Sequence, residues 1–154
     1  MTKLMLVEDD FSLRDIYSAR FMAEGYTVVT ASDGEEALAI AVREKPDLIV
    51  LDVMMPKISG FDVLDILRST PETKSTKVVM MTALSQETDR QRGESLGVDE
   101  YLVKSQVTLE DVVSTVKGVL GTTANGGAPA TGAQPLAPGQ QQQPPPPAPP
   151  TPGV

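Results

Sequence analysis

The chain has 154 residues, which favours one domain, and its 21 acidic and 13 basic side chains give a formal net charge of −8. This acidity disfavours direct nucleic-acid binding, which needs basic side chains to neutralise phosphates. The sequence has no cysteine and no histidine, which excludes disulfides, zinc–sulfur sites and a phosphohistidine on this chain. No apolar run reaches the length of a signal peptide or a membrane span, so we expect a soluble cytoplasmic protein without a membrane partner.

Five short apolar runs predict β-strands, and most are continuous, as in strands buried on both faces of a parallel sheet. The runs are Leu4–Val7, Tyr26–Thr30, Leu48–Leu51, Val78–Met81 and Tyr101–Val103. A helical segment follows each run, so strand and helix alternate five times. This alternation predicts a doubly wound α/β sheet with right-handed crossovers and a ligand site at the carboxyl ends of the strands.

The predicted helices have recognisable starts and stops. The first contains Leu13, Ile16, Tyr17 and Phe21 at helical spacing, and Gly25 occupies the C-cap position. A capping-box pattern over 32–35 begins the second, which runs toward Pro46. The third spans 61–68, and the fifth begins at Thr108, with Asp111 three residues later. The fourth, between Leu84 and Leu96, has no large apolar residue and includes Gly93, so we expect it to be the least stable helix.

The composition changes from about Gly121 onward. This segment has no charged residue and holds ten of the thirteen prolines, four of them at 144–147. We therefore predict a folded domain over 1–120 and a disordered Pro/Gln/Gly/Ala-rich tail over 121–154, with the proline block in an extended polyproline II conformation. A plain extension is favoured over a tether, a spacer or a polyproline ligand.

Polar side chains follow four of the predicted strands. They are Glu8, Asp9 and Asp10 after the first, Asp52 after the third, Thr82 after the fourth and Lys104 after the fifth. Taken singly, each has an ordinary role as a helix cap, a turn former or a surface lysine. Together at one sheet edge, the carboxylates would repel each other and need either a proton or a cation, and among cations Mg²⁺ suits oxygen ligands best. A carboxylate can also be the nucleophile in phosphoryl transfer.

The order and spacing of these residues resemble the receiver domain of bacterial two-component response regulators, and in particular a stand-alone regulator of the chemotaxis type. Thr82 lies 30 residues and Lys104 52 residues after Asp52, as in that family. The matching segments are 6–10, 51–56 with Gly60, 81–83 and 99–104. The resemblance covers residues 1 to about 120 and implies a flavodoxin-like (βα)5 fold with strand order 2-1-3-4-5.

The resemblance also implies a role for each matching residue. Asp52 would be the phosphoacceptor. Asp9 would bind Mg²⁺ directly and Glu8 mostly through water, with the backbone carbonyl of Met54 as a further ligand and Asp10 less suited. Thr82 would donate a hydrogen bond to a phosphoryl oxygen, and Lys104 would pair with the phosphoryl group. Tyr101 matches the aromatic switch position, whose ring turns inward when Thr82 moves.

The function implied is that of a phosphoacceptor switch rather than a turnover enzyme. A histidine kinase or phosphotransfer protein would phosphorylate it, and the fourth helix, fifth strand and fifth helix would then change their interaction with an unidentified effector. We expect a monomer or a weak phosphorylation-dependent dimer. The alternative is a pseudo-receiver that binds partners without phosphorylation. An aspartate-nucleophile phosphatase is disfavoured, because such enzymes need a second catalytic Asp at position 54, which is Met here. Flavin binding is also disfavoured, because no glycine- or hydroxyl-rich phosphate loop follows the first strand.

One position departs from the family pattern. The family usually has proline after the lysine of the fifth strand, with a cis peptide bond, whereas Ser105 follows Lys104 here. A cis bond before a residue other than proline costs roughly 2.5–4 kcal/mol. We therefore expect this connection to differ in shape from that of the family.

Overall fold

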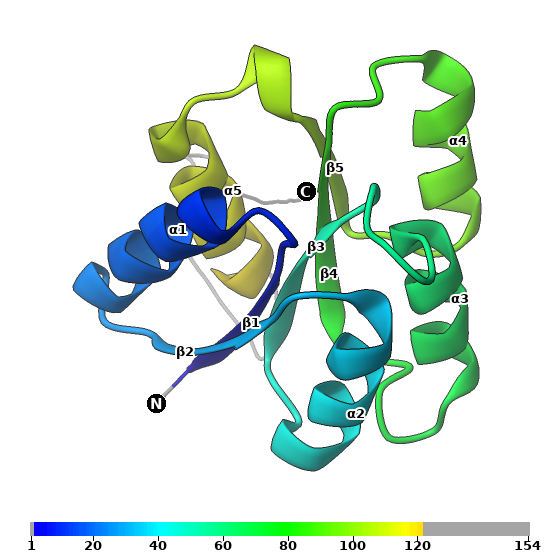
Figure 1. Ribbon diagram of the computed structural model, residues 1–154, viewed down its shortest axis with the longest axis horizontal. Coiled ribbons are helices and arrows are strands. Elements are labelled where there is room, and N and C mark those ends of the chain that lie inside the picture. Colours follow the sequence, from blue (N-terminus) through cyan, green and yellow to red (C-terminus); the bar gives the residue numbers. More distant parts are fainter. Residues whose placement is uncertain (1, 122–154) are drawn as a thin grey trace, which may run out of the picture. The chain divides into compact units, whose positions relative to one another are not determined.

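Five strands alternate with five helices along residues 2–121, which are the residues that this computed structural model describes (Figure 1). Within these residues, one compact unit ends at Lys117. The predicted tail lies outside the described residues, and its boundary stays a prediction. The elements are β1 (Lys3–Val7), α1 (Phe11–Ala23), β2 (Thr27–Ala31), α2 (Gly34–Glu44), β3 (Leu48–Asp52), α3 (Gly60–Ser69), β4 (Lys77–Thr82), α4 (Glu87–Ser95), β5 (Glu100–Val103), the 3-10 turn η1 (Lys104–Gln106) and α5 (Leu109–Gly121).

The five strands form one parallel sheet with the order β2-β1-β3-β4-β5. The predicted fold class and strand order are therefore confirmed. The register places Val7 beside Ala31 and Leu51, and Thr82 beside Val103. Because all strands run in one direction, their carboxyl ends lie along the same edge, where the order reverses beside β1.

Helices cover both faces of the sheet. Figure 1 shows α1 and α5 on one face and α2, α3 and α4 on the other. Alternate strand residues therefore enter two apolar layers, as the twofold period of a strand requires. The layer that includes α2 and α3 contains Met5, Val7, Ile49, Leu51, Val78, Met80, Phe61 and Leu64. Buried residues outside that cluster include Leu4, Leu6, Phe21, Val79, Val112 and Val116.

None of the helices within residues 2–121 combines the length and the apolar character that crossing a bilayer requires.

Helix α1 ends in a Schellman motif. Gly25 has φ +99° and donates its N–H to the Met22 carbonyl, while Tyr26 donates its N–H to the Phe21 carbonyl. The Phe21 and Tyr26 rings also meet edge to face, with centroids 6.4 Å apart. Tyr26 thus belongs to the helix stop and not to the second strand, which begins one residue later than predicted.

Side chains cap the next elements nearly as the sequence indicated. The N-cap of α2 is Asp33 rather than Ser32, and Glu36 accepts hydrogen bonds from the backbone N–H and hydroxyl of Ser32. At the start of α5, Thr108 and Asp111 form a capping box at the spacing noted from the sequence. Thr108 accepts from the N–H of Asp111 at 3.1 Å, and Asp111 accepts from the N–H of Thr108 at 2.9 Å.

Helix α4 is held differently from the others. Its N-cap residue, Gln86, makes no side-chain capping bond, and Gly93 is its buried residue. A Cβ atom at Gly93 would lie 3.1 Å from the Tyr101 ring, so the helix backbone packs directly on β5. Two arginines that precede Gly93 in the helix hold their guanidinium groups over aromatic rings, Arg90 over Tyr101 at 5.3 Å and Arg92 over Phe61 at 4.4 Å.

Candidate functional site

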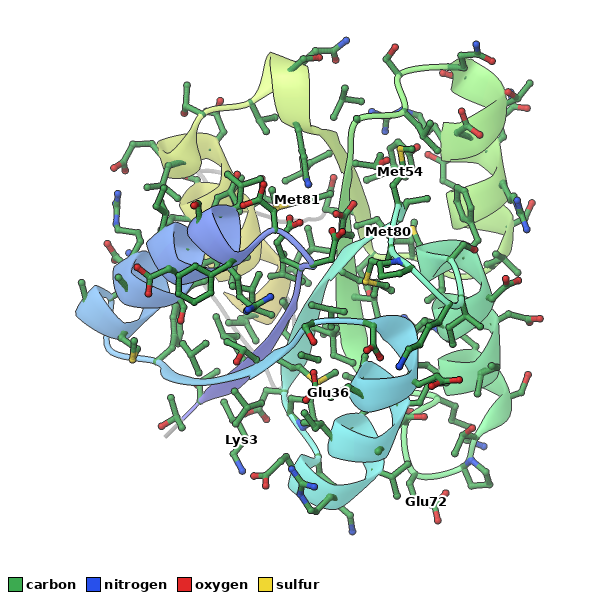
Figure 2. The ribbon with its side chains drawn as sticks, viewed as in Figure 1. Lys3, Glu36, Met54, Glu72, Met80 and Met81 are labelled. Atoms are coloured by element: carbon green, nitrogen blue, oxygen red, sulfur yellow. The ribbon has the colours of Figure 1, made fainter. Side chains whose placement is uncertain are left out.

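Acidic side chains gather at the carboxyl edge of the sheet. Carboxylate oxygens of Glu8, Asp9 and Asp52 lie within 4.8 Å of one another. Glu8 and Asp9 follow β1, and Asp52 is the last residue of β3, so neighbouring strand ends bring them together. In Figure 2, Met54 marks this edge of the sheet, and Lys3 lies toward the opposite ends of the strands.

Lys104 joins two of these carboxylates. Its Nζ atom donates a hydrogen bond to Glu8 Oε1 at 2.9 Å and another to Asp52 Oδ2 at 3.1 Å. Burial lowers the pKa of Lys104, but the hydrogen bond to Glu8 and the negative charges of Asp52 and Glu8 outweigh it and raise the pKa overall. The ammonium group therefore stays charged, and Lys104 is not an ordinary solvated surface lysine.

Glu8 lies in the least favourable place for a charge. It is only 3% exposed, and burial, opposed by the Lys104 hydrogen bond but reinforced by the charge of Asp52, raises its pKa. One ammonium group faces three carboxylates, so the site keeps an excess of negative charge when all three are ionised. A cation beside Asp9, the exposed member, would neutralise that excess.

Asp10 does not belong to this cluster, because its side chain is the N-cap of α1. Its side chain caps α1 by accepting the N–H of Leu13 at 3.0 Å, and its backbone N–H donates to Glu8 Oε2. The sequence did not single out Arg14, which donates to the Glu8 carbonyl oxygen at 2.7 Å. The sequence shows only that Arg14 lies in the first turn of a helix that follows an acidic run. A solvent-exposed arginine without any contact to the site would show the same pattern.

The loop after β3 presses against Asp52. Asp52 Oδ1 accepts the backbone N–H of Met54 at 3.2 Å. Gly60 donates its N–H to the Val53 carbonyl at 2.8 Å, and a Cβ atom at Gly60 would lie 2.4 Å from the Asp52 carbonyl oxygen. Only glycine fits at this point, because any side chain would displace the backbone that carries Asp52.

Thr82 and Tyr101 are both hydrogen-bonded to the backbone of Leu84. The Thr82 Oγ1 atom accepts the Leu84 N–H at 3.0 Å, and the Tyr101 hydroxyl donates to the Leu84 carbonyl at 3.2 Å. Both residues are buried, with 0% and 3% of their surface exposed. Thr82 does not cap α4, whose N-cap is Gln86, so that ordinary role is wrong.

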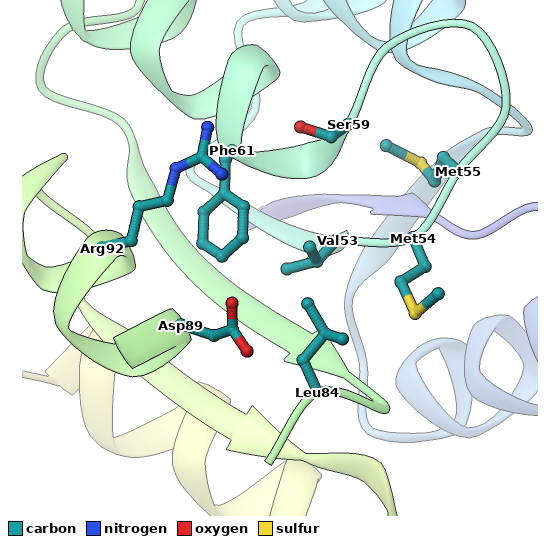
Figure 3. Close-up of a pocket in the computed structure, with 8 residues that line it drawn as sticks. All are labelled: Val53, Met54, Met55, Ser59, Phe61, Leu84, Asp89 and Arg92. Carbon is teal, nitrogen blue, oxygen red and sulfur yellow. The ribbon is translucent and has the colours of Figure 1, made fainter. Parts of the chain in front are cut away.

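A cavity of about 490 Å³ opens beside Asp52 (Figure 3). The β3–α3 loop forms one side, through Met54 and Met55, and Leu84 and helix α4 form the other. Its base includes Val53 and Phe61, each 3% exposed. Ser59, Asp89 and Arg92 complete the lining, so the cavity next to the loop that follows Asp52 combines apolar side chains with polar and charged ones.

These residues fit a hard divalent cation. The donor set consists of carboxylate oxygens without sulfur or imidazole, which suits Mg²⁺. The Lys104–Ser105 peptide is trans, since no cis bond occurs in residues 2–121, and the turn η1 begins at Lys104. The lysine reaches the carboxylates in this conformation.

An acidic all-oxygen site at the switch point of a 2-1-3-4-5 parallel sheet defines a flavodoxin-like phosphoacceptor domain. The family model for the response regulator receiver domain matches residues 4–117. This chain belongs to that family. Accordingly, it is a phosphoacceptor in two-component phosphorelay signalling and not a turnover enzyme.

Curated relatives share the domain. The chain is 42% identical over 123 residues to a probable transcriptional regulator, ycf27, of Cyanophora paradoxa, covering 80% of this chain and 50% of that protein. It is 37% identical over 123 residues to the DNA-binding dual master transcriptional regulator RpaA of Synechocystis, covering 80% and 51%. The chain thus spans about half the length of these relatives. Stand-alone status and the absence of nucleic-acid contacts stay predictions.

Solved structures agree in fold. The chemotaxis protein CheY4 of Vibrio cholerae superposes with a TM-score of 0.73 at 34% identity, over 77% of this chain and 98% of that one. The response regulator TrrA of Thermotoga maritima, solved in complex with Mg²⁺ and BeF, gives a TM-score of 0.68 at 32% identity, over 77% and 99%.

Proposed function

We propose that Asp52 accepts a phosphoryl group from the phosphohistidine of a sensor kinase or phosphotransfer protein in a Mg²⁺-dependent reaction. The observation that carries this proposal is the position of the Lys104 ammonium group, which hydrogen-bonds Asp52 and Glu8 while the Asp9 carboxylate lies beside both. An Asp52 oxygen attacks phosphorus, and the bond from phosphorus to the histidine nitrogen breaks. The nitrogen leaves with the electron pair.

Asp9 and Asp52 would hold Mg²⁺ directly, with Glu8 acting mostly through water and the Met54 carbonyl as a further ligand. The metal supplies positive charge for the transferred phosphoryl oxygens. Lys104, which is bonded to Asp52, would add a second positive charge. The acidic excess described above, together with a relative solved with Mg²⁺ and BeF, supports this assignment.

Thr82 and Tyr101 would report the phosphorylation. The Thr82 hydroxyl would donate to a phosphoryl oxygen, and a turn of Thr82 toward that oxygen would move the β4–α4 connection with it, because Leu84 is bonded to both Thr82 and Tyr101. Tyr101 already lies inward in this structure. The phosphorylated arrangement would change the surface of α4, β5 and α5, which presents the domain to an effector.

The decisive experiment is incubation with Mg²⁺ and acetyl phosphate, followed by intact-mass measurement. We expect the mass of one phosphoryl group to appear in the wild type and in Asp65→Asn, an exposed control on α3, but not in Asp52→Asn. Chelation of Mg²⁺ should abolish the gain. No gain in any variant with any small phosphodonor would favour the phosphorylation-independent pseudo-receiver.

A further inference from the structure

Methionine is the residue type of this chain that we expect to react with oxidants. The sequence has seven methionines, no cysteine and no tryptophan. A two-electron oxidant such as hydrogen peroxide therefore finds thioethers and no thiolate in the protein. The reaction is governed by access to the sulfur, so burial decides which methionines are modified.

Two methionines are exposed within residues 2–121. Met22 on α1 is 54% exposed and Met54 in the β3–α3 loop is 55% exposed. Three others, Met5, Met80 and Met81, lie in strands and are at most 2% exposed, and Met55 is half-buried. Figure 2 shows Met80 and Met81 on the sheet and Met54 at its edge. Peroxide should therefore reach Met22 and Met54 about equally well.

The two exposed residues differ in what surrounds them. Met54 follows Asp52 by two positions, and its N–H is bonded to Asp52 Oδ1. Its thioether lines the cavity beside Asp52 together with Leu84 (Figure 3). We propose that Met54 is a peroxide-sensitive modification site, and that its conversion to methionine sulfoxide shortens the lifetime of the phosphoryl group on Asp52. The second half rests on the proposed function.

The modification balances without any group held by the protein. The Met54 sulfur gives a lone pair to one peroxide oxygen, the O–O bond breaks, and the second oxygen leaves as water after proton transfer. Sulfur is oxidised by two electrons and peroxide is reduced by two. Methionine sulfoxide reductases reverse the reaction, so the change is a reversible one.

The effect on lifetime follows from polarity. The unmodified thioether and the Leu84 side chain line the cavity that adjoins the loop after Asp52, and they offer an attacking water no hydrogen-bond partner. A sulfoxide oxygen at the same place is a strong hydrogen-bond acceptor and can orient that water. One additional hydrogen bond to the attacking water should speed hydrolysis of the aspartyl phosphate about fivefold.

The test uses the full chain in three forms: wild type, Met54→Leu and Met22→Leu. Each is treated with hydrogen peroxide, and peptide mass mapping locates the added oxygen. Each is then phosphorylated with Mg²⁺ and acetyl phosphate, freed of donor, and followed for loss of the phosphoryl group. The measured quantity is the ratio of the decay rate of the treated protein to that of the same protein untreated.

We expect oxygen on Met54 and Met22, and a decay ratio near five in wild type and in Met22→Leu that returns to one after sulfoxide reductase treatment. In Met54→Leu the ratio should stay at one. An unoxidised Met54, or an equal ratio in wild type and Met54→Leu, overturns the inference. If no untreated form takes up a phosphoryl group, the proposed function fails instead, and the oxidation map still decides whether Met54 is modified.

Discussion

The Tyr101 hydroxyl donates a hydrogen bond to the Leu84 carbonyl at 3.2 Å. The N–H of Leu84 donates a hydrogen bond to Thr82 Oγ1, so both backbone polar groups of Leu84 are bonded to residues of the sheet. The β4–α4 connection is therefore fixed from β4 and β5 at once.

Tyr101→Phe should remove one of these bonds and leave the ring packing intact. Since the Leu84 carbonyl is partly buried, we expect the free energy of unfolding to fall by about 0.5–1.5 kcal/mol, measured by urea denaturation. Tyr26→Phe is the control, because the Tyr26 hydroxyl makes no hydrogen bond within the described residues. An equal loss in both variants would show that the Leu84 bond contributes nothing.

Lys104→Gln should strengthen metal binding and weaken switching. The ammonium group occupies the acidic cluster and repels an incoming cation. Its removal should tighten Mg²⁺ binding by roughly tenfold, or about 1.4 kcal/mol, in titration calorimetry. Lys74→Gln, an exposed lysine of the α3–β4 connection, should leave the affinity unchanged. Weaker binding in Lys104→Gln would contradict the competition between lysine and metal.

Gly60→Ala should destabilise the domain and disturb Asp52 together. Its Cβ atom would meet backbone atoms of Asp52 and Val53 at 2.4 and 2.7 Å, which cannot move aside cheaply. We expect a loss of about 1–3 kcal/mol and slower phosphorylation. Gly118→Ala is the matched control, since its Cβ would meet nothing within 4 Å and alanine favours a helix by up to about 1 kcal/mol. A neutral Gly60→Ala would refute the close approach.

Amide hydrogen exchange should be fastest in α4 among the helices of residues 2–117. Gly93 is its buried residue, whereas α3 buries Phe61, Val63, Leu64 and Leu67 besides Gly60. Removing the guanidinium contact in Arg92→Ala should accelerate exchange in α4 further without changing α3. Equal protection of α3 and α4 would contradict the weak attachment of α4.

Acid should weaken the contact between α1 and α5. Glu24 is bonded to Lys117 and Arg20, which lower its pKa in that order. An acid whose pKa is lower in the folded state adds stability above its unfolded value of about 4.3, and this stability is lost as the pH falls through the folded value. Melting temperatures from about pH 7 to 3 should therefore fall less steeply in Glu24→Gln than in wild type. Glu94→Gln, on α4 and without an ion pair in residues 2–121, should follow the wild type.

Most of the fold could be predicted because burial on both faces leaves a strong pattern. Continuous apolar runs gave the strands to within a residue or two, and glycine or capping residues marked the helix ends. The errors lie where hydrogen bonding decides between neighbours. Asp33 rather than Ser32 caps α2, and Tyr26 closes the first helix instead of opening a strand.

The site was predictable as a set of residues but not as a geometry. The predicted strand ends identified the site residues, because the carboxyl ends of parallel strands lie along one edge of the sheet. These residues are Glu8, Asp9, Asp52, Thr82 and Lys104. That Lys104 joins two carboxylates, and that Thr82 and Tyr101 meet through Leu84, depends on side-chain directions that no sequence pattern encodes.

Helix α4 buries a glycine and no large apolar side chain, and Arg90 and Arg92 attach it through contacts with aromatic rings instead. A helix anchored by leucine or phenylalanine opens a void when it shifts, and that void penalises every intermediate position. Sliding α4 over β5 vacates no such volume. We therefore expect a shift of this flank to cost less free energy than a shift of a helix that buries leucine and phenylalanine, such as α3.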